Sequence, residues 1–114
     1  MTADDFREIV LNMEGAVEGA HMKHPDFRAN GRIFASLHSE DRFGMVKLTP
    51  EEQAVFLREH PETFEPSAGA WGRQGCTNVK LATADKRAVR SAARLAWDGV
   101  MAMAPPKTRR KKAR

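Results

Sequence analysis

The sequence predicts one α+β domain made of an N-terminal helix, an antiparallel sheet interrupted by a short helix, and a long C-terminal helix. Apolar residues recur at helical spacing near both ends of the chain, and short segments between them alternate apolar and polar residues. The Asn30-Gly31 pair between two such segments is a strong hairpin signal. The 114 residues suffice for one hydrophobic core without disulfides or metals. We assign residues 1–104 to this domain and residues 105–114 to a basic tail.

The first helix is expected from about Ala3 to Met13, because Thr2 and Asp5 have the spacing of a capping box. Its apolar stripe should pack on the sheet and consists of Phe6, Ile9, Val10 and Met13. Gly15 ends the helix, and residues 16–22 are predicted to form a short strand.

Two registers are possible for the hairpin around Asn30-Gly31. A two-residue turn would set Phe27 opposite Phe34, whereas a three-residue loop would pair Phe27 with Ile33 and Arg28 with Arg32. We favour the three-residue loop because it separates an apolar face from a polar one. The apolar face is then Phe27, Ile33, Ala35 and Leu37, and the outer face is Asp26, Arg28, Arg32, Phe34 and Ser36. The facing arginines would form either a phosphate seat or an ordinary solvated pair.

The middle of the chain continues with strands and a short helix. Residues 42–48 alternate, with Gly44, Val46 and Leu48 on one face and Phe43, Met45 and Lys47 on the other. Thr49-Pro50-Glu51-Glu52 starts a helix of about ten residues. Residues 63–66 are expected to form a short edge strand, and the Trp71-Gly72 segment a loop. In the next strand, residues 76–81, the inward positions are Thr77, Val79 and Leu81, and the outward ones are Cys76, Asn78 and Lys80.

The last helix is expected from about Ala84 to Met103, starting at Thr83 or Asp85. Its buried stripe is Val89, Ala92, Ala93, Ala96, Val100 and Met103. Lys86, Arg90 and Arg94 repeat every four residues along the exposed face. This row would either follow a phosphate backbone or be an ordinary solvated helix face.

The basic character of the chain comes from its C-terminal end. Residues 107–114 hold six of the nineteen basic residues and no acid. The rest of the chain has thirteen basic and fifteen acidic residues, and therefore a net charge of −2. Pro105 and Pro106 end the preceding helix, and a segment so poor in apolar side chains is expected to be disordered. It would bind polyanions through counterion release or serve only to raise solubility.

No catalytic residue, metal or cofactor is expected. In a strand, the rings of His21 and His24 would point to opposite faces, so a shared metal is disfavoured. Cys76 has no sequence signature of a nucleophile, and Gly69–Gly75 lacks the Lys-Ser/Thr of a phosphate-binding loop.

A single cysteine and the lack of an N-terminal apolar segment favour a cytoplasmic protein. No apolar run reaches the ~18 residues of a membrane span. A monomer is favoured, although the sequence does not fix the oligomeric state.

Several short motifs follow one another in a distinctive order. They are Gly15, Val17 and Glu18, then His24-Pro-x-Phe27, Gly31-x-Ile33-Phe34, Lys47-Leu48, and Trp71-Gly72 with Val79 and Leu81. Their order and spacing resemble the MmcQ/YjbR-like family of small α+β proteins over nearly the whole chain except the tail. The resemblance implies a double-wing arrangement of strands and binding of DNA. Cys76 departs from the pattern, since relatives often carry a bulky aromatic residue there, and this puts a base-stacking role at that position in doubt.

Two functions are compatible with these observations. The first, which we favour, is non-catalytic and sequence-tolerant DNA binding, with Phe34 or Trp71 as an aromatic surface. Its basic wing residues are Arg28, Arg32, Arg42, Lys47, Arg73 and Lys80, and its tail residues are Arg109, Arg110, Lys111 and Lys112. The second is binding of an anionic small molecule or a protein partner in a pocket lined by His24, Phe34 and Trp71. Trp71 is also compatible with a core position. Whether the six basic wing residues share one face would separate the two functions.

Overall fold

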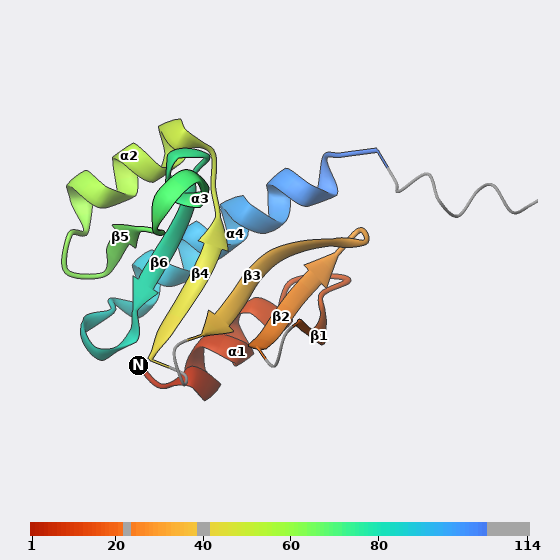
Figure 1. The fold of residues 1–114 in the computed structure, drawn as a ribbon. Coiled ribbons are helices and arrows are strands. Elements are labelled where there is room, and N and C mark those ends of the chain that lie inside the picture. Colours follow the sequence, from red (N-terminus) through yellow and green to blue (C-terminus); the bar gives the residue numbers. More distant parts are fainter. Residues whose placement is uncertain (22–23, 39–41, 105–114) are drawn as a thin grey trace, which may run out of the picture.

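The computed structural model describes residues 1–21, 24–38 and 42–104. Within them, six antiparallel strands form one sheet in the order β1-β2-β3-β4-β6-β5 (Figure 1). The strands are β1 (Val17–His21), β2 (His24–Ala29), β3 (Arg32–His38), β4 (Phe43–Lys47), β5 (Phe64–Pro66) and β6 (Cys76–Lys80). The helices are α1 (Ala3–Leu11), α2 (Pro50–Glu59), α3 (Gly69–Arg73) and α4 (Lys86–Met101), with a 3-10 turn at Leu81–Thr83. The predicted α+β class is therefore confirmed.

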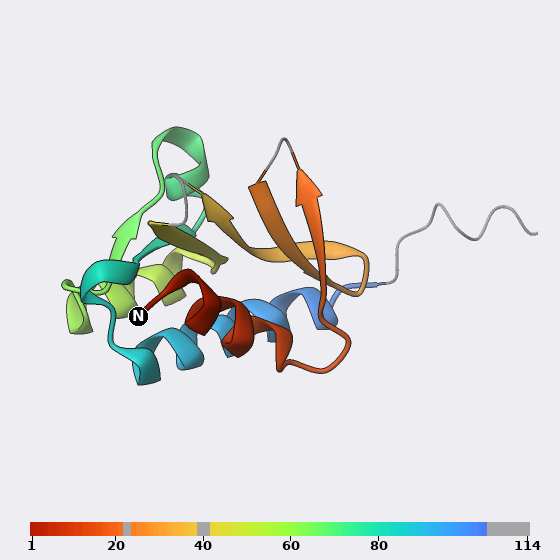
Figure 2. The ribbon, with the colours of Figure 1, turned by 90° about the horizontal axis from the view of Figure 1, so that it is seen from below.

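Helices α1 and α4 lie together on one face of the sheet, and the opposite face is left open between β1–β2 on one side and the β5–α3 segment on the other (Figure 2). The core lies between the sheet and these two helices. Phe6, Phe27, Phe34 and Val89 are fully buried there. Gly44 allows α1 to approach the sheet, because a Cβ at this position would lie 2.7 Å from the Phe6 ring.

Both predicted capping boxes are present. Thr2 Oγ1 accepts from the backbone N–H of Asp5 at 3.0 Å, and Thr49 Oγ1 accepts from that of Glu52 at 3.1 Å. Helix α1 ends at Leu11, two residues earlier than predicted. The predicted strand over residues 16–22 is β1, and Met22 lies outside the described residues.

The favoured hairpin register is wrong. Asn30 and Gly31 both have positive φ, 55° and 73°, and form a two-residue turn that pairs Ala29 with Arg32 and Arg28 with Ile33. Past these pairs the register shifts, so that Phe27 pairs with Ala35 and Phe34 is the extra residue of a β-bulge.

The bulge changes which side chains reach the core. Phe27, Ala35 and Leu37 are buried as predicted, but Phe34 is also fully buried, and Ile33 lies on the open face of the sheet instead. Arg28 and Arg32 are not opposite each other, so the phosphate seat between them does not exist. The prediction compared two uniform registers, and neither allows the local shift that buries Phe34 together with Ala35 and Leu37.

The other elements differ from prediction in three places. The Trp71-Gly72 segment is a short helix, α3, and not a loop. Cys76 faces the open side but is buried, because α3 packs against β6. Met103 lies beyond the end of α4 and is 47% exposed, so it does not belong to the buried stripe. The start of α4 is capped by Asp85, which accepts from the N–H of Ala88 at 3.1 Å. None of the helices in the described ranges has the length and apolar character needed to cross a membrane.

Candidate functional site

A groove with a volume of 570 Å³ lies on the open face of the sheet, between β2–β3 and the β5–α3 segment. Outward-facing side chains of four strands form its floor, and α3 forms one wall. The described residues that line it are His24, Pro25, Asp26, Ile33, Ser36, His38, Met45, Lys47, Ser67, Ala68, Trp71, Cys76 and Asn78. His24 and Trp71, predicted to share a pocket, are thus brought together.

Trp71 is 66% exposed on α3, so its interpretation as a core residue is wrong. The helix that carries it is held closely to the sheet by backbone contacts. A Cβ at Gly72 would lie 1.9 Å from the carbonyl oxygen of Ser67, and one at Gly75, where φ is +111°, would lie 2.0 Å from that of Leu48. Gln53 Nε2 also donates to the carbonyls of Gly72 and Cys76, both at 3.0 Å. The backbone of α3, which carries the exposed indole, is therefore closely packed at the groove.

The acid in the groove, Asp26, is neutralised from within the protein. Its carboxylate accepts from Arg28 Nε at 2.9 Å and from Arg28 Nη2 at 3.1 Å. The hydrogen bond with Asp26, followed by the attraction between the two charges, raises the pKa of Arg28 above its usual range. Gly19 on β1 leaves room for this pair, because a Cβ there would lie 3.1 Å from Asp26 Oδ1. Lys47 is then the one lysine or arginine among the described lining residues.

The pKa values of two other titratable groups of the groove are shifted in the direction that favours the uncharged form. Burial, and to a lesser extent the charge of His24, lowers the pKa of His38, while a hydrogen bond with Asn78 opposes the shift. The His38 ring stacks on Phe43 with 6.2 Å between ring centroids. Burial raises the pKa of the Cys76 thiol, and the nearby Lys47 opposes this. Cys76 is therefore not an activated nucleophile. Within the described ranges, no three His, Cys, Asp or Glu side chains are placed to hold a metal ion.

The predicted wing cations do not gather at the groove. Arg28 is bound to Asp26, and Lys80 donates to the carbonyl oxygen of Pro61 at 3.0 Å. Arg32 donates to the carbonyl oxygen of Ala104 at 2.7 Å. Arg42 and Arg73 are exposed outside the groove, and Lys47 alone lines it. Phe34 is buried on the other face, so it neither lines the pocket nor offers an aromatic surface. The tail residues Arg109, Arg110, Lys111 and Lys112 lie outside the described residues.

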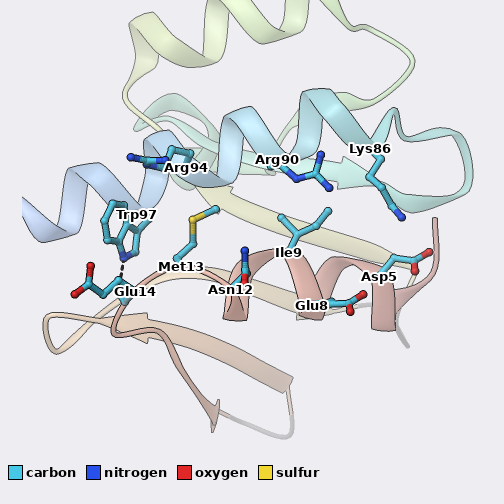
Figure 3. Close-up of a pocket in the computed structure, with 10 residues that line it drawn as sticks. All are labelled: Asp5, Glu8, Ile9, Asn12, Met13, Glu14, Lys86, Arg90, Arg94 and Trp97. Atoms are coloured by element: carbon cyan, nitrogen blue, oxygen red, sulfur yellow. Dashed lines mark hydrogen bonds between the residues drawn. The ribbon is translucent and has the colours of Figure 1, made fainter.

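A second cavity of 660 Å³ lies between α1 and α4 and contains the row of cations on α4 (Figure 3). Lys86, Arg90 and Arg94 line it from α4, and the side chains across from them come from α1 and the residues that follow it. Within the described part of the chain, Lys86 and Arg90 form no ion pair. Arg94 lies 3.6 Å from Asp98 and 5.3 Å from the centre of the Trp97 ring.

Trp97 closes one end of this second cavity. Its indole Nε1 donates to the carbonyl oxygen of Glu14 at 2.8 Å and so joins α4 to the segment after α1. The acids Asp5, Glu8 and Glu14 also border the cavity, so it is mixed in charge. The four-residue repeat of cations was visible in the sequence. Which acids face these cations could not be predicted, because it depends on how α1 and α4 pack against each other.

Comparison with known proteins bears on the fold. No family model matches the sequence, and no curated protein matches it either. The structure is similar to the crystal structure of Deinococcus radiodurans protein DR2400, a DUF419 domain, with a TM-score of 0.75 and 18% sequence identity. The similarity covers 97% of this chain and 86% of that chain. At this identity the likeness shows a shared fold, so the chain has the fold of the DUF419 domain of DR2400.

Proposed function

We propose that this protein belongs to the MmcQ/YjbR family and is a non-catalytic DNA-binding protein that holds duplex DNA by phosphate contacts from α4 and the basic tail. The observation that supports the proposal most is the arrangement of the basic residues along the C-terminal part of the chain. The exposed row Lys86, Arg90 and Arg94 runs along α4, and the chain continues from α4 into a tail with six further basic residues.

The residues that lead into the tail have a defined place on the molecule. Asn30 Nδ2 donates to the carbonyl oxygens of Val100 and Met103 at 2.8 and 2.9 Å, and Arg32 holds that of Ala104. The turn between β2 and β3 therefore fixes the chain where the tail begins. Arg32, predicted to touch phosphate, instead donates to Ala104, the last described residue before the tail.

The geometry of α4 is compatible with contact to several phosphates. Eight residues separate Lys86 from Arg94, which corresponds to ~12 Å along a helix. Along the axis of a duplex lying parallel to α4, this distance covers about three phosphates of one strand, which are ~3.4 Å apart in that direction. Such contacts carry no sequence information, so binding is expected to be sequence-tolerant. The net charge of −2 on residues 1–106 keeps it weak, and leaves the tail as the main source of affinity.

The salt dependence of duplex binding tests this proposal. Fluorescence anisotropy over a range of salt concentrations gives the slope of log affinity against log salt, to which each neutralised phosphate contributes about −0.9. Deletion after Pro106 should reduce the slope by roughly 3, as expected if three or four tail cations engage. The double variant K86A/R90A should reduce it by about 2. The matched control is R42A/R73A, which removes two exposed wing cations and should leave the slope unchanged.

Two outcomes would contradict the proposal. If R42A/R73A lowers the slope and the tail deletion does not, the wings carry the contact. If the full chain does not bind duplex near physiological salt at ~100 μM, a concentration typical of non-specific binding, DNA binding itself is wrong.

A further inference from the structure

We infer that the groove on the open face of the sheet is a second binding site, for a planar heteroaromatic ring that carries one anionic group. This goes beyond the proposed DNA contact, which uses α4 and the tail on other parts of the molecule. A nucleotide has this chemistry, either free or as one unit of a single strand.

The position of Trp71 points to a planar ring. Trp71 is a large apolar side chain that remains 66% exposed, although α3 is fixed by the close contacts of Gly72 and Gly75 and by Gln53. A tryptophan that served only the core would be turned inward, as Trp97 is when it bonds to Glu14. An exposed indole on a fixed support offers a flat surface on which a ring can stack.

The rest of the lining completes an amphipathic site. Ile33 and Met45 provide an apolar floor beside Trp71, while Ser36 and Asn78 offer polar groups to the edge of a ring. The volume of 570 Å³ falls within the range of small-molecule sites and suits a ring with an attached sugar or side chain.

The charges of the groove favour a single negative group on the ligand. Asp26 is compensated by its two hydrogen bonds from Arg28, and this leaves the exposed Lys47 ammonium without a counter-charge among the described lining residues. A carboxylate or phosphate would supply it. The two-residue turn contributes to the site as well, because it places Ile33 on the open face and Phe34 in the core.

Tryptophan fluorescence provides the test, with AMP and adenosine as probes. AMP should quench the emission of the full-length protein in a saturable way, and W71F should abolish the quenching while the emission of Trp97 remains. K47A should weaken AMP binding by about tenfold, as expected for loss of a charge-assisted contact, and should leave adenosine binding unchanged. R42A serves as the matched control, since it removes an exposed cation outside the groove.

A short single-stranded oligonucleotide separates the two sources of the ligand. If it binds more tightly than AMP and depends equally on Trp71, the groove takes one unit of a strand; if only AMP binds, the ligand is free. The inference is overturned if AMP gives no saturable change up to about 1 mM, if W71F is quenched by AMP as the native protein is, so that the signal comes from Trp97, or if K47A binds AMP with native affinity. Tail deletion should leave AMP binding intact, and W71F should leave the duplex salt slope intact, so failure at one site is distinguishable from failure at the other.

Discussion

Individual side chains decide which cations are free to meet a ligand. Three of the wing cations donate hydrogen bonds within the chain. Arg28 donates to the Asp26 carboxylate, Arg32 to the Ala104 carbonyl and Lys80 to the Pro61 carbonyl. Two of these three partners are far away in the sequence, so a list of basic residues could not reveal them. His24 and Trp71 line one groove, as the pocket hypothesis predicted, although the helix that carries Trp71 was not predicted.

His38 gives a prediction at this scale. Its pKa should lie below 6.5 in the folded protein, because burial disfavours the charged ring and the charge of His24 adds to this. A lowered pKa means that the unfolded chain binds the proton more readily, so stability is lost as pH falls from about 6.5 through the folded pKa. NMR titration of the His38 ring measures the pKa. Urea unfolding across the same pH range should show a flatter profile for H38Q, and parallel profiles would rule out the effect.

Among the elements, the β2–β3 hairpin was predicted from the sequence, but its register was not. The Asn30-Gly31 turn, both capping boxes and the stripe of α4 depend on residues near one another in the chain, and the sequence indicated them. The bulge depends on packing against α1 and α4, because it buries Ala35 and Leu37 in addition to Phe27 and Phe34. Strands that alternate strictly cannot place all four of these side chains on one face.

Truncation of neighbouring residues in β3 tests the bulge. F34A should destabilise the protein by about 3 to 5 kcal/mol, since it empties a fully buried position. I33A should cost much less, because Ile33 lies half-buried on the groove face. Chemical denaturation measures both. The opposite order of stability would restore the three-residue loop register.

Helix α3 was missed for a similar reason. Its three nearby glycines indicate a loop, whereas its position is set by a close contact of Gly72 with Ser67, five residues earlier, and by a long-range contact of Gly75 with Leu48. These contacts determine where Trp71 stands, and with it one wall of the groove.

Substitution of glycine by alanine at two helical positions tests this support. G72A should destabilise the protein and shift the environment of Trp71, because the new Cβ would overlap the Ser67 carbonyl. G99A on α4 meets nothing within 4 Å and should stabilise the helix by about 0.5 to 1 kcal/mol. Thermal unfolding and Trp71 emission report the two effects. Equal behaviour of the two variants would contradict a close contact at Gly72.

At the scale of the whole molecule, two surfaces have separate chemistry. The open sheet face holds an apolar groove with Trp71 and Lys47, whereas α4 bears a row of cations and leads toward the basic tail. The sequence indicated the tail and the row, but it placed the main phosphate contacts on the wings. The internal partners of three wing cations make α4 the better candidate.

Chemical-shift mapping by NMR tests the proposed DNA contact most directly. Addition of a short duplex at low salt should shift the amides of residues 86–94 and of the tail, and leave Arg42, Arg73 and the Trp71 indole unchanged. Addition of salt should reverse the shifts. Shifts confined to the wings or the groove, or no shifts at all, would contradict a DNA interface on α4 and the tail.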